Sequence, residues 1–153
     1  MSQYLLYWKP EVAQRTEDEP LIAHAASDQL DKVGVGDVLW IVTSEGPDDL
    51  ILVGRLRVDR IVGQEQAQRE LRRTDLWEAR YHAISDAPEE QVLLDISRFA
   101  SNLTFDGTVE CLPAGFTGRN LQAMRRLDCG GSEWMEYLWA RRSENQDIPA
   151  IDT

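Results

Sequence analysis

Val33-Gly-Val-Gly-Asp-Val-Leu-Trp-Ile-Val-Thr-Ser44, followed after a short loop by Leu50 to Val62, is the stretch that decides the fold of this chain. Two runs rich in aliphatic, β-branched and aromatic residues that flank a loop with Gly and Pro are typical of a β-hairpin. The first run is apolar on both faces, which predicts a central strand. The second run alternates apolar residues with Arg55, Arg57 and Asp59, which predicts a strand with one solvent face. Residues 34 to 62 are therefore expected to form a hairpin at the heart of a sheet.

Further strands are expected on both sides of this hairpin in the sequence. Tyr4 to Trp8 is a short aromatic and aliphatic run that stops at Lys9-Pro10, since proline lacks a backbone donor. Trp77 to Ile84 predicts another strand, because Ala79, Tyr81 and Ala83 alternate with Arg80, His82 and Ile84. Leu103 to Phe105 predicts a last short strand. The polar segment from Glu11 to Pro20 predicts an exposed loop.

Helices are predicted where helix-forming residues follow a capping residue or precede a glycine. The expected helices cover Ala23 to Leu30, a segment starting at Asp86, the segment from Leu121 to Leu127, and a C-terminal segment capped by Ser132. Gln64 to Arg73 is expected to be a short surface helix or an ordered loop. Together with the strands they predict the α+β class.

The chain has 153 residues, a length at which one hydrophobic core is sufficient, so residues 1–142 are expected to form a single domain and residues 143–153 a frayed tail. The start shows no basic segment followed by an apolar run, and no window approaches the roughly 20 apolar residues of a membrane helix. We therefore expect a cytoplasmic protein without a membrane partner.

The residues give little support to a metal, a cofactor or a catalytic centre. Cys111 and Cys129 stand apart without a Cys-x-x-Cys pair, and two free cysteines are the expected state. The only histidines are His24 and His82, and neither lies in a recognised hydrolase motif. Gly34-Val-Gly36 precedes a strand instead of opening a helix, so a turn explains it better than a phosphate loop. No metal, no cofactor and no enzymatic activity are expected.

The net charge of −11 argues against a protein that holds nucleic acid by bulk electrostatics. The basic residues are unevenly placed, because residues 55 to 80 carry seven Arg against five acidic residues and residues 98 to 142 carry six against five. Arg is suited to phosphates and to stacking, although genome composition explains a preference for Arg equally well.

Aromatic residues stand near predicted strand ends, at Tyr7, Trp8, Trp40 and Trp77. Flat rings brought together there would hold a planar ligand, because stacking on a base contributes roughly 1 to 3 kcal/mol. Placement of each tryptophan in the core remains the alternative, and Trp40 in particular would then be scaffold.

The order of these elements resembles the PUA-like superfamily, and within it the EVE domain, which is related to YTH and ASCH domains. The likeness lies in the aromatic-Lys-Pro end of the first strand (Tyr7 to Pro10), the Val33-Gly-Val-Gly-Asp37 turn before a strand, and the aliphatic-Gly strand Leu52 to Val58. The resemblance implies a curved mixed β-sheet or small β-barrel with flanking helices. It also implies a pocket for a flipped or single-stranded modified base of DNA or RNA. The acidic segment Glu17 to Glu19 and the extended C-terminal helical region depart from the family.

On this resemblance, the candidate base-binding residues are Trp8, Trp40 and Trp77 as stacking walls and Lys9, His24, Ser27 and Ser44 as polar contacts. The candidate phosphate contacts are Arg55, Arg57 and Arg119. The leading hypothesis is a non-catalytic domain that recognises a modified or flipped base. One alternative is an interaction or regulatory module that offers its acidic surface and the segment from Trp134 to Arg142 to a protein partner. A small-molecule enzyme that uses His24 or His82 is the third.

Overall fold

The hairpin predicted for residues 34 to 62 is the centre of the fold. In the computed structural model, which describes residues 1–15, 21–107 and 110–143, strand β3 (Val38–Thr43) pairs antiparallel with β4 (Ile51–Arg57). Every residue of β3 is buried, and β3 is the middle strand of a five-stranded sheet with the order β7-β4-β3-β1-β8. The central position predicted for this strand is confirmed.

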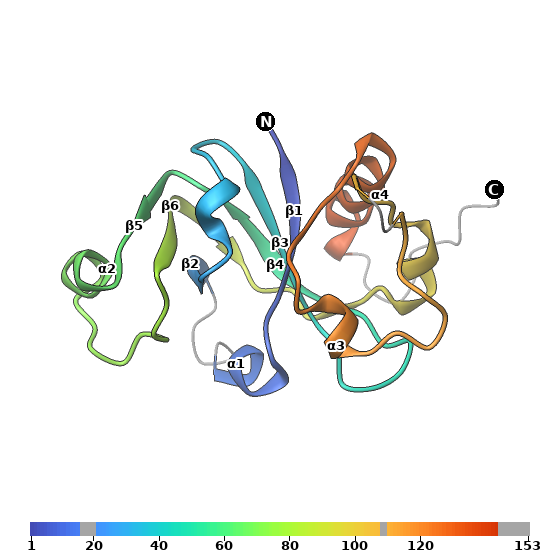
Figure 1. The fold of residues 1–153 in the computed structure, drawn as a ribbon, viewed down its shortest axis with the longest axis horizontal. Coiled ribbons are helices and arrows are strands. Elements are labelled where there is room, and N and C mark those ends of the chain that lie inside the picture. The colour runs from blue at the N-terminus through green and yellow to red at the C-terminus, as the bar shows by residue number, and fades with distance from the viewer. Residues whose placement is uncertain (16–20, 108–109, 144–153) are drawn as a thin grey trace.

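The other strands of this large sheet make it a mixed sheet. The predicted first strand is confirmed as β1 (Gln3–Tyr7), which lies parallel to β3. Two short strands, β8 (Arg125–Arg126) and β7 (Leu94–Asp95), pair antiparallel with β1 and β4. Figure 1 shows this sheet in the middle of the molecule, with helix α4 (Cys129–Ala140) on one side and the second sheet on the other.

The second sheet contains a segment for which the sequence prediction is wrong. Ala23 to Leu30 was expected to be a helix, but the chain forms strand β2 (Leu21–Ser27) and then the short 3-10 helix η2 (Leu30–Lys32). Strand β2 is one edge of a three-stranded antiparallel sheet with the order β2-β6-β5, in which β6 is Tyr81–Glu90 and β5 is Arg60–Val62. Ile22 and Ala25 are buried in the core that this sheet shares with the large sheet, so tertiary packing outweighs a weak helix preference.

The run from Leu50 to Val62 does not stay in one sheet. Strand β4 ends at Arg57, and β5 (Arg60–Val62) belongs to the second sheet. The chain crosses at Val58 and Asp59, because the Val58 N–H donates to the Asp37 carbonyl while the Asp59 N–H donates to the Ile84 carbonyl.

Strand β6 (Tyr81–Glu90) starts later and ends later than predicted. The helix expected from Asp86 is therefore wrong, and only the 3-10 helix η3 (Ser97–Asn102) forms in that region. Strand β2 pairs Ile22 with Glu89 and His24 with Ile84, so the residues of β6 between these pairs bulge out of the ladder. Pro88 lies in that bulge, where a missing donor costs little.

The remaining helices are short and surround the sheets. Of the two structures expected for Gln64 to Arg73, a surface helix and an ordered loop, the helix forms, as α2 (Gln64–Leu71). The loop expected from Glu11 is wrong as far as residue 15, because α1 (Pro10–Arg15) begins with proline at a favoured first position. The rest of that expected loop, residues 16–20, and the expected tail after Ser143 lie outside the described residues.

The C-terminal region also differs from its prediction. Helix α4 (Cys129–Ala140) begins before Ser132, because the Asp128 carboxylate caps it by accepting from the Gly131 N–H at 2.8 Å. The helix expected around Leu121 is a single turn, α3 (Gly118–Leu121), followed by β8. Thr104 and Phe105, expected in a strand, form isolated bridges with Cys111 and Leu127.

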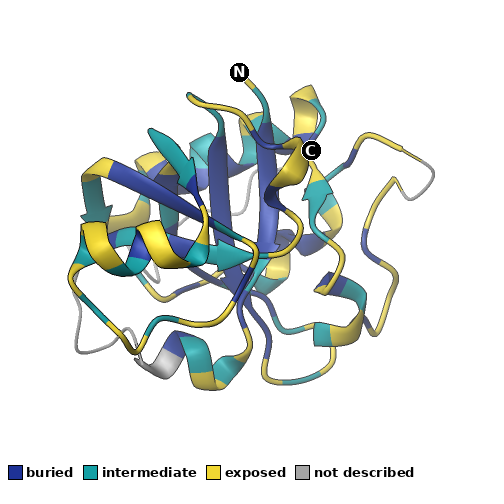
Figure 2. Ribbon diagram, turned by 60° about the vertical axis from the view of Figure 1, so that its left-hand side comes forward, coloured by how far each residue is buried: buried dark blue, intermediate teal, exposed yellow. Residues whose placement is uncertain are grey.

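The large sheet separates two cores, as its apolar pattern on both faces requires. Val38, Trp40 and Val42 pack with residues of α4, and Leu39 and Ile41 pack with residues of β2. The buried residues of the central strands stand out in Figure 2. The class is α+β, and the described strands form two sheets rather than one closed barrel. Among the described helices, none has both the length and the apolar character needed to span a bilayer.

Gly54 of β4 lies in close contact with Ile22 of the second sheet. A Cβ at this position would lie 2.3 Å from Cδ1 of Ile22 on β2. Gly54→Ala is expected to lower the free energy of unfolding by about 1 to 3 kcal/mol, because the added methyl overpacks the core. Ile22→Val removes Cδ1, so in that background the same change should cost at least about 1 kcal/mol less in denaturant unfolding. Equal costs in the two backgrounds would contradict this packing.

Candidate functional site

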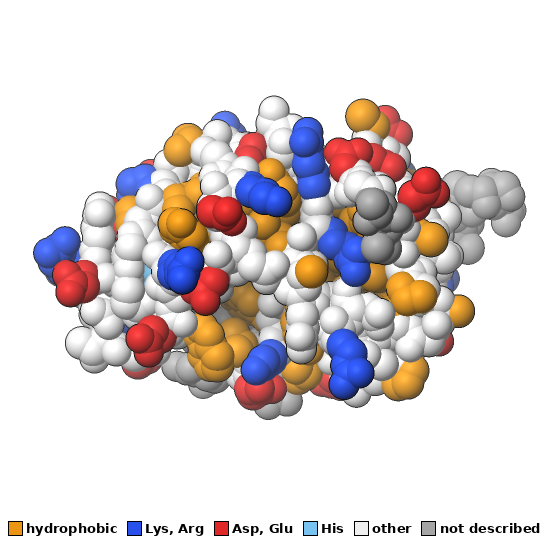
Figure 3. All heavy atoms as spheres, viewed as in Figure 1, with side chains coloured by type: hydrophobic (Ala, Val, Ile, Leu, Met, Phe, Trp, Pro, Cys, Tyr) orange, Lys and Arg blue, Asp and Glu red, His pale blue; other side chains and the backbone are white. Residues whose placement is uncertain are grey.

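A cavity of about 610 Å³ opens where the end of β1, strand β2 and the segment after α2 come together. This volume lies in the range of small-molecule sites in proteins, roughly 300 to 1,000 Å³. Figure 3 shows the surface hollowed below the centre of the view, with hydrophobic side chains around the hollow. The lining residues are Tyr7, Trp8, Lys9, Val12, Leu21, Ile22, Ala23, His24, Ala26, Leu71, Arg73, Asp75, Leu76, Trp77 and Gln122.

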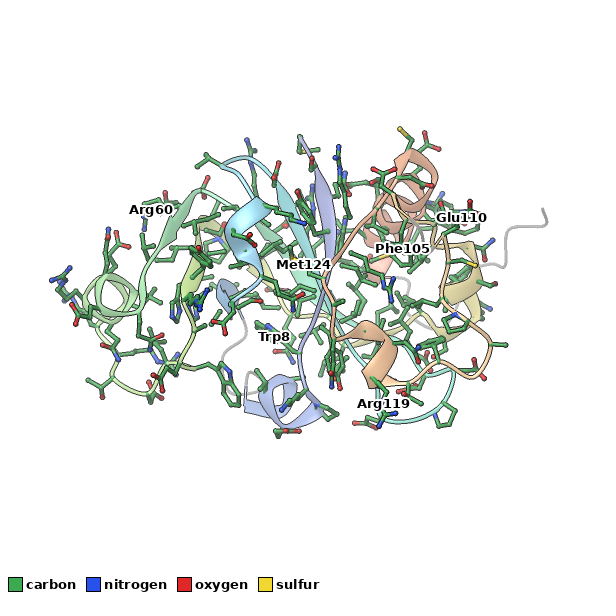
Figure 4. All side chains as sticks on the ribbon, viewed as in Figure 1. Trp8, Arg60, Phe105, Glu110, Arg119 and Met124 are labelled. Carbon is green, nitrogen blue, oxygen red and sulfur yellow. The ribbon has the colours of Figure 1, made fainter. Side chains whose placement is uncertain are left out.

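Two tryptophans belong to the wall of this cavity. Trp8 directly follows β1, and its backbone N–H donates to the Val42 carbonyl at 2.8 Å, which ties it to the large sheet. Trp8 is largely buried, and Figure 4 shows it between α1 and the strands. Trp77 lies in the segment between α2 and β6 and is 47% exposed. The cavity therefore has one fixed and one accessible indole.

Two histidines meet at the cavity. Strand β2 carries His24 and β6 carries His82, and Nε2 of His24 lies 2.5 Å from Nδ1 of His82. On its other side, His82 Nε2 lies 2.5 Å from Oε1 of Gln64, at the start of α2. His82 is fully buried, whereas His24 is half-buried and lines the cavity. The pairing of β2 with β6 brings these three side chains into one hydrogen-bonded chain.

Both imidazoles are neutral at neutral pH. Burial, then the neighbouring His82 and Arg73, lowers the pKa of His24 from 6.5 to about 4. Burial also lowers the pKa of His82, against the opposite effect of a backbone hydrogen bond at Ala79. Neutral imidazole offers one donor and one acceptor, so the pair adds polarity to the site without adding charge.

The charged groups of the wall are partly compensated. Nε and Nη2 of Arg73 each lie 2.9 Å from a carboxylate oxygen of Asp75, which is a bidentate ion pair. Lys9, next to Trp8, is exposed. Within the described residues, no group of three or more His, Cys, Asp or Glu side chains is placed to hold a metal ion.

Comparison with family models, with curated proteins and with solved structures gives no match for this chain.

The structure brings four of the seven residues predicted for base binding to the cavity, namely Trp8, Lys9, His24 and Trp77. The other three lie elsewhere. Trp40 is 0% exposed and donates from Nε1 to Gln3 Oε1 at 2.7 Å, so it has no surface to offer a ligand. The Ser44 hydroxyl donates to the Gly46 carbonyl at the end of the hairpin, and the Ser27 hydroxyl accepts from the Gln29 N–H.

None of the three arginines predicted for phosphate contact lines the cavity. Arg55 forms ion pairs with Glu89 through Nη1 at 3.6 Å and with Glu136 through Nη2 at 3.2 Å. Arg57 is exposed on β4. Arg119 is exposed on α3, and Figure 4 shows it away from Trp8.

Several residues of the site had no signal in the sequence. Gln64, Arg73 and Asp75 stand in a polar stretch that predicts only a surface helix or loop. The sequence offers His82 only as a catalytic candidate, because 58 positions separate it from His24. Of the two histidines, only His82 stands in a segment that the sequence predicts as a strand, so the sequence gives no indication of their contact.

Proposed function

We propose that this chain is a non-catalytic domain of PUA-like kind that binds DNA or RNA and takes one modified or flipped base into the cavity. The observation that carries the proposal is that three separate segments of the chain, which supply Trp8 with Lys9, His24, and Trp77, line a single cavity. Aromatic walls favour planar ligands. A mixed sheet with a second sheet and flanking helices is compatible with the resemblance to the PUA-like superfamily.

The charge of the protein supports recognition of a base more than recognition of a backbone. With a net charge of −11, non-specific attraction to phosphate is weak. A base taken into a cavity contributes stacking and edge hydrogen bonds that do not depend on overall charge. Lys9 at the cavity then supplies a local contact for a phosphate.

The apolar part of the wall supports a modified base over a plain one. Leu71, Leu76 and Val12 line the cavity beside the tryptophans. A methyl group that is buried against such side chains contributes about 0.8 kcal/mol relative to water.

The chemistry of the wall supports binding rather than catalysis. Among the described lining residues, none is Ser, Thr or Cys. A histidine with a pKa of about 4, such as His24, is a weak general base at neutral pH. The Asp75 carboxylate is engaged by Arg73.

Trp77→Ala is expected to weaken binding about tenfold or more, because it removes one stacking surface. The measurement is fluorescence anisotropy with labelled single-stranded DNA and RNA oligonucleotides that carry one central 5-methylcytosine, 5-hydroxymethylcytosine or N6-methyladenine. Matched oligonucleotides with the unmodified base give the preference for modification. Each titration is repeated at low and at physiological salt, because phosphate contacts weaken with salt while stacking persists.

Leu93→Ala is the matched control, because Leu93 is similarly exposed, at 42%, and lies outside the cavity. It should leave affinity unchanged. Failure of every modified oligonucleotide to bind more tightly than its plain counterpart would overturn the proposal. Equal loss in Trp77→Ala and Leu93→Ala would place the binding site elsewhere.

The alternative of a protein-binding helix has less support from the structure. Met135, Leu138 and Trp139 of α4 are buried in the core beside the large sheet. Trp134 packs on Phe99, with ring centroids 5.7 Å apart. Met135, Leu138 and Trp139 therefore pack within the fold of their own chain and are not available to a partner protein.

A further inference from the structure

The hydrogen-bonded chain of Gln64, His82 and His24 has a direction, and one backbone group fixes it. Oε1 of Gln64 lies 3.0 Å from the backbone nitrogen of Ala79. A backbone N–H only donates, so the Gln64 side-chain atom at this position is its carbonyl oxygen, which accepts.

The same oxygen sets the proton positions on both histidines. Nε2 of His82 lies 2.5 Å from it and must carry a proton to donate. Since a neutral imidazole is protonated on only one of its two nitrogens, Nδ1 of His82 is unprotonated and accepts a hydrogen bond. Nε2 of His24 lies 2.5 Å from that atom and therefore donates, which leaves Nδ1 of His24 without a proton.

The neutral state on which this assignment depends follows from burial. His82 is fully buried, and burial is the main cause that lowers the pKa of both rings. Within the part of the chain that the structure describes, the His24 ring forms no hydrogen bond other than the one to His82. His24 is also the member of the chain that lines the cavity.

We infer that His24 is a fixed hydrogen-bond acceptor of the cavity, and that the preferred ligand is a base that presents an N–H group to its Nδ1. This inference rests on the proposed function and specifies the ligand. The cationic side chains of the wall, Lys9 and Arg73, can only donate. The edge of a base carries both donors and acceptors. Lys9 and Arg73 can donate to its acceptors, and Nδ1 of His24 can accept from its donor. A base whose N–H is replaced by N-methyl leaves that acceptor unpaired and is disfavoured.

The proton positions are tested without any ligand by the ¹⁵N chemical shifts of the two imidazole rings at neutral pH. We expect Nε2 protonated and Nδ1 unprotonated in both His24 and His82. In Gln64→Leu, the acceptor that sets the direction is lost, and the shifts should move towards a mixture of the two tautomers. A protonated Nδ1 on His24, or unchanged shifts in Gln64→Leu, would overturn the inference whatever the binding result.

The ligand preference is tested with pairs of single-stranded oligonucleotides that differ only in the N–H groups of one central base. The pairs are adenine with N6,N6-dimethyladenine, cytosine with N4,N4-dimethylcytosine, guanine with N1-methylguanine, and thymine with N3-methylthymine. We expect the base that binds best to bind about tenfold or more tightly than its N-methylated partner. His24→Phe should bring the two members of that pair to similar affinity, whereas Trp77→Ala should weaken both.

These outcomes separate the two proposals. If no oligonucleotide binds, the proposed function fails. If oligonucleotides bind through Trp77 but the difference within the pair is absent, or persists in His24→Phe, only the role of His24 fails. In the His24→Phe variant, the ¹⁵N chemical shifts of the His82 ring show whether the protein is folded.

Discussion

Trp40→Ala is expected to lower the free energy of unfolding by about 3 to 5 kcal/mol, as is usual when a buried aromatic side chain is removed. Trp40 is 0% exposed in the middle of the central strand. Its ring meets that of Trp139 edge-on, with centroids 5.8 Å apart. Loss of the indole also leaves Oε1 of Gln3 without its 2.7 Å donor. Since small domains are stable by only about 5 to 15 kcal/mol, this change removes a large part of the total.

Denaturant unfolding of Trp40→Ala beside Trp77→Ala gives the measurement and its control. The two variants remove the same side chain, one from the core and one that is 47% exposed at the cavity. Trp77→Ala should cost less than about 1 kcal/mol. Similar costs for both variants would contradict the division into a scaffold tryptophan and a site tryptophan. A Trp40→Ala protein that does not fold at all agrees with the prediction, and Trp40→Phe then gives the smaller, measurable loss.

The central hairpin could be predicted because its signals are local. A strand that is apolar on both faces, a loop with glycine and proline, and a partner with alternating charges all lie within 34 to 62. The division of the second run between two sheets could not be predicted, because it depends on the Asp59 N–H reaching the Ile84 carbonyl. Local composition carries no information on that long-range bond.

Strand β2 is a second element whose structure depends on long-range contacts that the local sequence does not reveal. Its sequence, Leu21 to Ser27, is rich in alanine and fits a helix by propensity. Its pairing with β6 and the packing of Ile22 against Gly54 decide otherwise. Because the contact of His24 with His82 depends on this pairing, a sequence interpretation that makes residues 23 to 30 a helix has no reason to bring the two rings together.

The candidate site was therefore predictable only in part. Trp8 and Lys9 are predictable because an aromatic-Lys-Pro end of a strand is visible in the sequence, and Trp77 because it is one of several aromatic residues near predicted strand ends. Trp40 satisfied the same criteria but faces the core, since alternate residues of a central strand point to opposite, equally buried faces. Charge failed as a guide for Arg55, whose acidic partners Glu89 and Glu136 lie far along the chain.

Acidification is expected to destabilise the protein between about pH 6.5 and pH 4 through His24 and His82. Burial, the nearby His82 and Arg73 lower the pKa of His24 from 6.5 to about 4 in the folded state. As the pH falls below 6.5, His24 becomes protonated in the unfolded chain but stays neutral in the folded chain. The free energy of unfolding therefore decreases as the pH falls. Above pH 6.5 the effect vanishes, and below pH 4 it is complete. For His24 alone it amounts to about 3 kcal/mol, since each pKa unit corresponds to about 1.4 kcal/mol.

The pH range in which the two histidines lower the stability differs from the range in which the Asp128 carboxylate does so. The charged side chains that share the cavity with it are Lys9, Arg73 and Asp75, and the buried neighbour is His82. The pKa of His82 is lowered mainly by burial, so its contribution has the same sign. The pKa of the Asp128 cap is lowered from 3.8 by the Gly131 N–H and by Thr104, so the stability that Asp128 contributes is lost only at more acidic pH.

Denaturant unfolding at several pH values from 7 to 4, for the natural chain and for a His24→Phe, His82→Leu double variant, checks this prediction. The double variant should show a much smaller decrease across the window, because the two titrating groups are gone. An equal decrease in both proteins would assign the effect to other groups, and a gain in stability on acidification would contradict the neutral histidine chain. The same measurement bears on ligand preference, since a protonated His24 has no lone pair at Nδ1. Because the folded ring takes up its proton only near pH 4, discrimination between N–H and N-methyl bases should persist through most of the pH range in which stability declines.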